Sequence, residues 1–313
     1  MLMKPMLRFV PDGTTIRFMN GRFAGLIVSA VLSTASAILF FYPGLNLGLD
    51  FKGGVVLQVE TPQAANFPAL RTALAQAGLA DASLQSFGAG GTGVLISLES
   101  KASAAATQTS ITEAQTALAN AAPGAKILST QAIGASVSNQ LFAQGLEALG
   151  LSFVMILAYI WFRFEWQFAV GAVTTLVLDT TKTIGFMVIT RIPFDLVTIA
   201  AILTIIGYST NDKVVVYDRV RENLRKYKTM PLRNLIDQSI NETLNRTLGT
   251  SGTVFLAALP LALFGGSALS GFAWIMLFGI VVGTSSSIFI AAPILLFLGE
   301  HRLRRSGSLP KAK

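Results

Sequence analysis

Long apolar segments dominate the pattern of hydrophobic and polar positions along this chain. A transmembrane helix needs roughly 20 mostly apolar residues to cross a hydrocarbon layer of ~30 Å. No Asp, Glu, Lys or Arg occurs between Arg246 and Glu300, so this stretch cannot form a surface in water. The pattern predicts an α-helical polytopic membrane protein with six transmembrane helices. They are expected at about 22–42, 142–162, 167–189, 195–216, 247–265 and 271–298.

Only the segment at about 43–140 has the polar content of a domain that folds in water. Its hydrophobic pattern and turn signals predict strands at 55–60, 82–87, 93–98 and 125–131, with helices at about 66–78 and 103–121. The order β-α-β-β-α-β is that of a small α+β domain of the ferredoxin-like type. The segment contains no cluster of catalytic residues, so we expect a binding or hinge module.

Composition supports a membrane protein and excludes several functional classes. Charged residues make up 13% of the chain, against roughly 25% in soluble globular proteins. The chain has no Cys and one His, His301, which excludes disulfides, a thiol nucleophile, a His-ligated metal site and a Ser-His-Asp triad. It also has no Walker A run, which excludes P-loop nucleotide hydrolysis. We therefore expect no enzymatic activity, no metal and no cofactor.

The distribution of positive charge predicts the orientation in the membrane. The formal net charge is +8, and basic residues concentrate in both tails, at Arg163 and in one loop. Cytoplasmic segments carry an excess of Lys and Arg, so both termini and this loop are expected in the cytoplasm. The bias accounts for the whole net charge, so membrane lipid is an expected partner and nucleic acid is not. The predicted parts are a tail 1–21, a first span 22–42, an outer domain 43–140, a membrane domain 141–298 that includes the cytoplasmic loop 217–246, and a basic tail 299–313.

Ionisable residues at membrane depth are the main candidates for function, because charges there are costly. Asp179 and Lys182 lie within one span at the i, i+3 spacing of a shared helix face, where they could simply neutralise each other. Lys213 could extend its stem to the cytoplasmic interface, and Arg246 could be an ordinary positive-inside anchor. Asp212 has too short a side chain to reach the interface. It must stay protonated, pair with a cation or line a wet cavity, and each of these makes it a candidate proton or ion carrier.

The residues around Asp212 strengthen this interpretation. The run Gly207-Tyr208-Ser209-Thr210-Asn211 places small and polar groups directly before it, and Ser209 and Asn211 could bond to neighbouring helices or to water. The last span carries Gly279 and Gly283 followed by four hydroxyl residues, a small-residue face that we interpret as a helix-packing surface.

At this point several motifs together resemble the SecF family, the smaller subunits of the bacterial SecDF complexes of protein secretion. The likeness covers nearly the whole chain. The motifs that carry it are Asp50-Phe51-Lys52-Gly53-Gly54, Arg163-Phe164-Glu165-Trp166, Gly207 to Asp212 with Val214 to Arg219 and Arg221-Glu222-Asn223, Arg246-Thr247, Thr250-Ser251-Gly252-Thr253, and Gly283-Thr284.

The resemblance implies a fold, partners and a mechanism. The chain would form the RND-like half of a pseudo-symmetric pair with SecD in the bacterial inner membrane, with 43–140 in the periplasm. The pair would work with the SecYEG channel on translocating, unfolded polypeptide, driven by the proton-motive force, and YajC is a further candidate partner. Asp212 matches the proton-pathway residue of the family and Arg246 its functional partner; Asp179, Asn211 and Ser209 complete the expected pathway. The coupling ion stays open between H⁺ and Na⁺, because a carboxylate among hydroxyls and amides serves either.

The chain also departs from the family pattern. The family usually has His where this chain has Leu178, and it usually has uncharged residues at the positions of Lys182 and Lys213. We hypothesise that the two lysines replace part of the hydrogen bonding around Asp179 and Asp212 and leave the intramembrane charge near zero. A permanent salt bridge would instead lock Asp212 and favour a non-conducting scaffold that assembles SecD with the channel. An RND-type exporter half is disfavoured by the small outer domain.

Overall fold

A computed structural model describes residues 11, 14–87, 91–99 and 104–298 of the chain. The predicted basic tail 299–313, the glycine-rich turn at 88–90 and most of the N-terminal tail lie outside the described residues.

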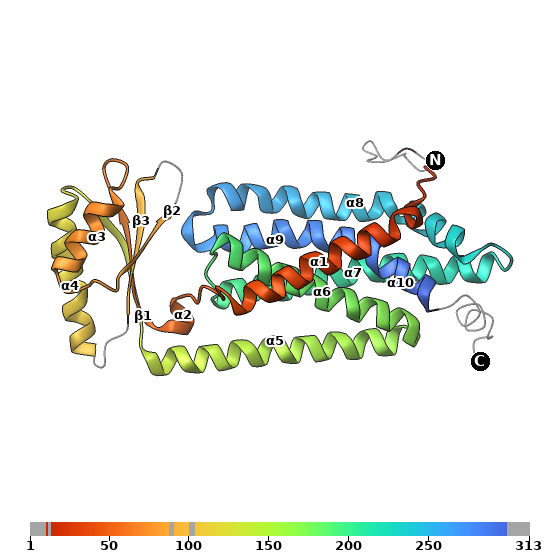
Figure 1. Ribbon diagram of the computed structural model, residues 1–313, viewed down its shortest axis with the longest axis horizontal. Helices are drawn as coiled ribbons and strands as arrows, with labels where there is room; N and C mark the ends of the chain where they lie inside the picture. Colours follow the sequence, from red (N-terminus) through yellow and green to blue (C-terminus); the bar gives the residue numbers. More distant parts are fainter. Residues whose placement is uncertain (1–10, 12–13, 88–90, 100–103, 299–313) are drawn as a thin grey trace, which may run out of the picture.

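The membrane part is an elongated helix bundle, and the outer domain lies at one end of it (Figure 1). The described residues contain six helices that are long and apolar enough to cross a membrane, which confirms a multispanning protein. A short helix η1 (Phe18–Gly21) precedes the first of them. The helices are α1 (Arg22–Phe41), α5 (Ala135–Arg163), α6 (Trp166–Thr190), α7 (Leu196–Lys226), α8 (Leu232–Phe264), and α9 (Gly266–Ser286), which continues through the π-helical η2 (Ser287–Ala291) into α10 (Ala292–Phe297).

The bundle has a buried layer and an outer layer. About half of the spanning residues of α6, α7 and α9 are buried, whereas fewer than a fifth of those of α1, α5 and α8 are buried. The sequence of α1 explains this arrangement, because its buried positions are Ser29, Ser33 and Ser36 at helical spacing and its apolar side chains face outward. Its close packing on α6 depends on Gly185, where a Cβ would lie 2.1 Å from Ser36 Oγ and 2.9 Å from Ser36 Cα.

The predicted loop 217–246 is a helical hairpin. Helix α7 continues to Lys226 and α8 begins at Leu232, so only a short turn separates the two helices. Both extensions bury an apolar face, which includes Val220 and Leu224 from α7 and Leu235 and Ile236 from α8. These side chains recur at helical spacing, and for this reason the segment stays helical beyond the apolar spans. The hairpin lies at the end of the bundle opposite the outer domain (Figure 1).

The outer domain is a four-stranded antiparallel sheet covered by two helices. Its elements in chain order are β1 (Gly54–Glu60), α3 (Phe67–Gln76), β2 (Ser83–Phe87), β3 (Gly93–Leu98), α4 (Ala104–Ala121) and β4 (Lys126–Ile133). The strand order is β2-β3-β1-β4, and the register pairs Leu57 with Ile96 and Val59 with Val94. Alternate residues of β1 and β3 point toward the helices and form the domain core, as the period-two pattern requires.

The junction between the two parts joins the outer domain to the start of α7. The Gly48 N–H donates to the Phe194 carbonyl at 2.8 Å, and the Phe194 N–H donates to the Asn46 carbonyl at 2.7 Å. In the short helix α2 (Leu49–Lys52), Asp50 Oδ2 accepts from the Leu196 N–H at 3.0 Å. The motif that begins at Asp50 therefore provides a second cap for α7, the helix that carries Asp212.

Candidate functional site

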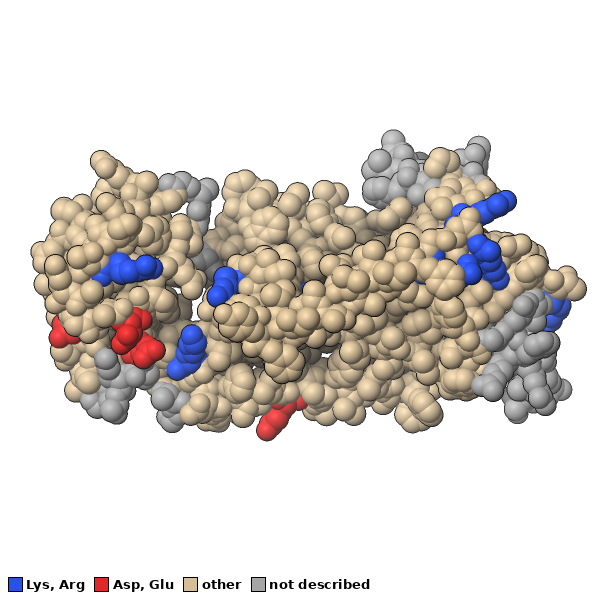
Figure 2. All heavy atoms as spheres, viewed as in Figure 1, with Lys and Arg blue, Asp and Glu red and all other residues tan. Residues whose placement is uncertain are grey.

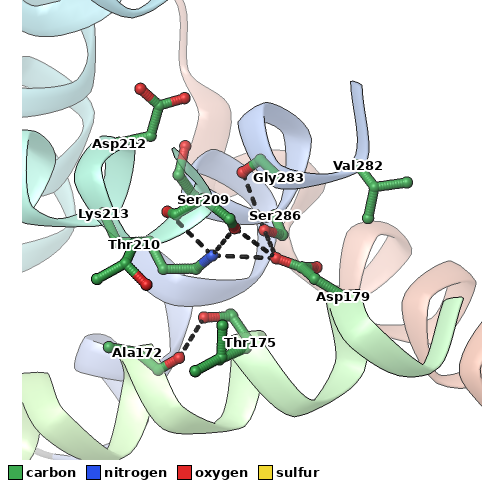
Figure 3. A network of polar contacts seen from close by, with 12 residues as sticks. Ala172, Thr175, Asp179, Ser209, Thr210, Asp212, Lys213, Val282, Gly283 and Ser286 are labelled. Atoms are coloured by element: carbon green, nitrogen blue, oxygen red, sulfur yellow. Dashed lines mark hydrogen bonds and ion pairs between the residues drawn. The ribbon is translucent and has the colours of Figure 1, made fainter. Parts of the chain in front are cut away.

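A carboxylate in the middle of the bundle gathers polar side chains from three helices. Asp179 on α6 is 2% exposed, and its Oδ1 accepts from Lys182 Nζ at 3.2 Å. Its Oδ2 accepts from Lys213 Nζ at 3.0 Å, from Ser209 Oγ at 2.9 Å and from Ser286 Oγ at 2.6 Å. Figure 3 shows the Lys213 and serine contacts converging on one carboxylate oxygen. We call Asp179, Lys182, Lys213, Ser209 and Ser286 the Asp179 cluster.

The number of donors fixes the charge state of Asp179. A protonated carboxyl group would itself be a donor, whereas an ionised carboxylate is acceptor-only and has about four acceptor sites. Asp179 receives four donors, three on Oδ2 and one on Oδ1, as expected of an acceptor-only carboxylate. Within the described part of the chain, no group of three or more His, Asp or Glu side chains could hold a metal.

The Lys213 side chain points in a different direction from the one considered from the sequence, which was toward the cytoplasmic interface. The side chain is 1% exposed and does not extend to the cytoplasmic interface. It turns along α7 to Ser209, one helical turn earlier, where Nζ donates to the carbonyl at 3.3 Å and also contacts Oγ. The strong attraction of the Asp179 carboxylate keeps the ammonium group inside the bundle.

Asp212 lies apart from this cluster although it is adjacent to Lys213 in sequence. Figure 3 shows its carboxylate pointing away from the Lys213 ammonium group. Asp212 is 1% exposed, and Oδ2 accepts from Thr284 Oγ1 at 3.3 Å. Thr284 Oγ1 lies 2.7 Å from Ser251 Oγ, which accepts from the Tyr208 hydroxyl at 3.0 Å. Asp212 therefore begins a chain of hydroxyl groups and has no ion pair among the described residues.

An apolar groove reaches this hydroxyl chain from the side of the bundle. It lies between α8 and α9 and has a volume of about 530 Å³. Ser251 and Thr284 are part of its lining, together with apolar residues that include Phe255 and Ile280. The hydroxyl neighbours of Asp212 are thus close to a surface that this chain alone leaves uncovered.

The structure does not bring the other two expected pathway residues to Asp212. Arg246 is exposed on α8 and has no ion pair in the portion of the chain that the structure describes. Asn211 is exposed on α7, with its side chain on the outer surface of the bundle. Of the expected residues, Asp179, Ser209, Lys182 and Lys213 come together, whereas Asp212, Asn211 and Arg246 do not contact one another.

Sequence reasoning missed the polar contributions of α8 and α9. Ser286 and Thr284 belong to a hydroxyl run that we interpreted as a packing surface, and Ser251 was only part of a motif. Each contacts a residue far away in sequence: Ser286 is separated from Asp179 by 107 positions. The available signal was the run of four hydroxyl residues in an uncharged span, which is expensive in lipid unless the hydroxyls find partners.

Fold and site together define a multispanning membrane protein with an ionisable cluster in its core. A model of the C-terminal region of the protein export membrane proteins SecD and SecF matches residues 113–301, and a model of the SecD/SecF GG motif matches residues 38–65. The chain therefore belongs to the SecD/SecF family of protein-export membrane proteins, as a SecF-type protein translocase subunit.

Two similar proteins match the sequence of this chain over nearly its whole length. The protein translocase subunit SecF of Rhodobacter capsulatus is 40% identical over 308 residues, which cover 95% of this chain and 92% of that relative. The subunit from Rickettsia rickettsii is 42% identical over 299 residues, which cover 96% of this chain and 97% of that relative.

Solved structures of SecDF share the fold. A crystal structure from Thermus thermophilus, described as a translocon-associated membrane protein, matches with a TM-score of 0.83 and 29% identity over 91% of this chain. A second SecDF structure, in a super-membrane-facing form, matches with a TM-score of 0.69 and 29% identity over 98% of this chain. The chain spans 39% and 41% of these two SecDF chains, so it corresponds to about two fifths of their length.

Proposed function

We propose that this chain couples a transmembrane proton gradient to protein translocation, with Asp212 as the residue that takes up and releases the proton. The observation that supports this role is the isolation of the carboxylate. It is 1% exposed, and among the described residues it has a hydroxyl partner and no ion pair. In this proposal the chain is a transport subunit and not an enzyme, and it works without a bound cofactor.

The contrast with Asp179 explains why Asp212 is the better carrier. Two ammonium groups and two hydroxyls hold Asp179 in its charged form. A buried carboxylate that makes no direct ion pair is costly, so Asp212 gains stability when it binds a proton. One elementary charge that moves through 100 mV releases ~2.3 kcal/mol. That is enough to shift a two-state equilibrium in the bundle by roughly fifty-fold.

We propose H⁺ rather than Na⁺ as the coupling ion. Proton uptake removes the buried charge of Asp212, whereas Na⁺ binding would require several oxygen ligands around it. Its contacts in the described structure are two hydroxyl groups, Thr284 Oγ1 at 3.3 Å and that of Ser251. Replacing Na⁺ by K⁺ in a translocation assay separates the two ions: a proton-coupled chain keeps its gradient dependence, and a sodium-coupled chain loses it.

We propose SecD as the partner that covers the outer face of α7. Thr204, Gly207 and Asn211 lie one helical turn apart, and all three are exposed in a helix that is long and apolar enough to cross the membrane. An amide exposed to lipid is costly, and small residues allow another helix to approach closely. The match to two fifths of a SecDF chain supports the same conclusion, since the rest of that chain has no counterpart here.

The remaining partners and the orientation follow from the family resemblance and the charge pattern. We propose that the chain lies in the bacterial inner membrane and acts with the SecYEG channel on unfolded polypeptide, with YajC as a further candidate. The helical hairpin, the start of α1 and the end of α10 lie at one end of the bundle, opposite the outer domain (Figure 1). On the face drawn in Figure 2, the described residues of that end show basic side chains without acidic ones, whereas the outer domain shows both, which supports a cytoplasmic location for that end and a periplasmic location for the outer domain.

The proposal is tested by gradient-driven protein translocation into membrane vesicles that contain this chain as their only SecF-type subunit. Asp212→Asn keeps the size of the side chain and much of its hydrogen bonding but cannot bind or release a proton. We expect this variant to lose the gradient-dependent part of translocation while it still assembles with SecD.

The matched control is Asp218→Asn, the same substitution on the same helix at an exposed position that pairs with Arg163. An exposed ion pair contributes ~0–1 kcal/mol, so this variant should keep its gradient dependence. If Asp212→Asn keeps its gradient dependence as well, the chain is a non-conducting scaffold and the ion path belongs to SecD.

A further inference from the structure

The Asp179 cluster contains one more positive charge than Asp179 can balance. Both lysines lie within salt-bridge distance of this single carboxylate, and their side chains are only 7% and 1% exposed. If both are protonated, the two ammonium groups and one carboxylate leave a net charge of +1 in the core of the bundle. An unbalanced buried charge is costly, and a protein usually relieves this cost by changing the protonation state of a group.

Asp212 is the group that can balance this charge. It directly precedes Lys213 on α7, and the two charges interact although the side chains point in different directions (Figure 3). With Asp212 ionised, the two aspartates and two lysines sum to zero. With Asp212 protonated, the sum is +1 and Lys213 loses a stabilising neighbour. The protonation states of the two adjacent residues are therefore linked.

The contacts of Lys213 suit both an ammonium group and a neutral amine. As an ammonium group, Nζ donates to Asp179 Oδ2, to the Ser209 carbonyl and to Ser209 Oγ. As an amine, it keeps two N–H donors for Asp179 and the carbonyl, and its lone pair accepts from the Ser209 hydroxyl, which is both donor and acceptor. Lys213 loses no contact when the proton leaves, whereas Asp179 loses the Ser209 hydrogen bond, because the single hydroxyl donor of Ser209 then points to Nζ. Lys182 remains on Asp179 Oδ1 and keeps that carboxylate paired.

We infer that Lys213 is a second proton-exchanging residue, linked to Asp212 by charge, in a two-residue relay on α7. This inference rests on the proposal that Asp212 takes up the coupling proton. In the step, one proton from one side of the membrane binds an Asp212 carboxylate oxygen. One proton leaves Lys213 Nζ toward the other side of the membrane. The lone pair of the broken N–H bond stays on nitrogen, and the charge of the four groups stays zero. Transfer of a proton from Asp212 to Lys213 then resets the relay.

The charged groups around Lys213 favour this assignment. Asp179 and Lys182 face it from α6, and Asp212 acts from its own helix. Helix α9 contributes the uncharged Ser286 to the same carboxylate oxygen. Of the two lysines, Lys213 is the one directly next to Asp212 in the sequence. For this reason its protonation state responds to the proton on Asp212.

The test is ¹⁵N NMR of the full-length chain in lipid bilayers at neutral pH, with the lysine ζ nitrogens labelled. Asp212→Asn mimics the protonated carboxyl group. We expect the wild type to show only ammonium signals and Asp212→Asn to show one additional neutral-amine signal per chain. The absence of an amine signal in Asp212→Asn overturns the inference.

Two variants of Lys182 in the Asp212→Asn background identify the amine. Lys182→Arg keeps a permanent charge on Asp179, because arginine is not deprotonated in proteins. The amine signal should therefore persist, and its loss would assign the amine to Lys182 and reject Lys213. Lys182→Met leaves one lysine and one carboxylate, so the signal should disappear. A signal that persists in Lys182→Met rejects the charge balance on which the relay depends.

Translocation measured on the same Asp212→Asn protein separates this inference from the proposed function. An amine signal together with unchanged gradient dependence supports the charge link between the residues and rejects Asp212 as the carrier. Lost gradient dependence without an amine signal supports Asp212 as the carrier and rejects Lys213 as its relay partner.

Discussion

At the scale of single residues, the two intramembrane aspartates have opposite surroundings. Asp179 is held by four donors, of which two are charged, and Asp212 by uncharged hydroxyls. Both carboxylates are almost completely buried, so burial alone does not distinguish them. The difference is the supply of positive charge, and it makes Asp179 a fixed anion that organises α6, α7 and α9 around it.

The Ser286 hydroxyl gives a direct test of this organising role. Its Oγ donates to Asp179 Oδ2 at 2.6 Å, and a hydrogen bond to a charged group contributes ~1.5–3 kcal/mol. Ser286→Ala should lower the free energy of unfolding by about this amount, as measured by chemical denaturation of the purified chain in detergent. Ser285→Ala is the control, because that side chain is exposed and, among the described residues, bonds only to the Val282 carbonyl. Equal losses in the two variants would contradict a structural role for the Asp179 anion.

The sequence identified the buried ionisable residues better than it identified their partners. The spacing of Asp179 and Lys182 predicted a shared helix face, and the two are paired. Adjacency suggested that Lys213 would lock Asp212, but consecutive helical residues point about 100° apart, and Lys213 faces α6 instead. Partners on distant helices, such as Ser286 for Asp179, depend on the packing of the bundle, which a single sequence does not encode locally.

At the scale of helices and strands, close packing in the bundle depends on small residues. Gly185 allows α1 to lie against α6, because a Cβ at this position would meet the Ser36 side chain and backbone. The neighbouring contacts on α1 are short serines and not large apolar side chains. Dispersion between closely packed backbones replaces the hydrophobic effect, which is weak between helices in lipid.

Gly185→Ala should therefore destabilise the bundle. Overpacking costs typically ~1–3 kcal/mol, and the close Ser36 Cα leaves little room for a side chain to move away. Gly150→Ala on α5 is the matched control, since nothing lies within 4 Å of its Cβ position. That change should be neutral or stabilising by up to ~1 kcal/mol because alanine favours the helix. Thermal unfolding in detergent checks both variants; a Gly185→Ala protein as stable as the control would contradict the close α1–α6 contact.

The element boundaries were easiest to predict where polar and apolar residues alternate clearly. The strands and helices of the outer domain begin and end close to their predicted positions, because glycines and prolines separate them. The segment 217–246 was predicted as a cytoplasmic loop between two spans, on the basis of its basic residues. Its buried face, which includes Val220 and Leu235, keeps it helical, and charged residues occupy the other side.

At the scale of the whole molecule, the exposed face of α7 indicates that the bundle is incomplete. Exposed apolar side chains on α1 and α5 are expected in lipid, whereas an exposed amide at Asn211 is not. The groove of about 530 Å³ beside Ser251 and Thr284 lies on the adjacent helices α8 and α9. A partner over the exposed face of α7 would cover the amide, and a partner over the groove would close the hydroxyl chain of Asp212 from lipid.

Gly207→Leu tests this arrangement at the level of the complex. Among the described residues, nothing lies within 4 Å of a Cβ at Gly207, so the larger side chain fits the isolated subunit and should leave its thermal unfolding unchanged. A partner helix packed against α7 would meet the leucine, and we expect co-purification of SecD to fall at least ten-fold, which corresponds to about 1.4 kcal/mol. Gly150→Leu, at a similarly open position on α5, should leave co-purification unchanged. If both variants retain SecD equally well, the partner binds elsewhere and Asn211 faces lipid. If only Gly207→Leu loses it, the helix that carries Asp212 and Lys213 lies directly at the interface, where proton exchange on this chain can act on its partner.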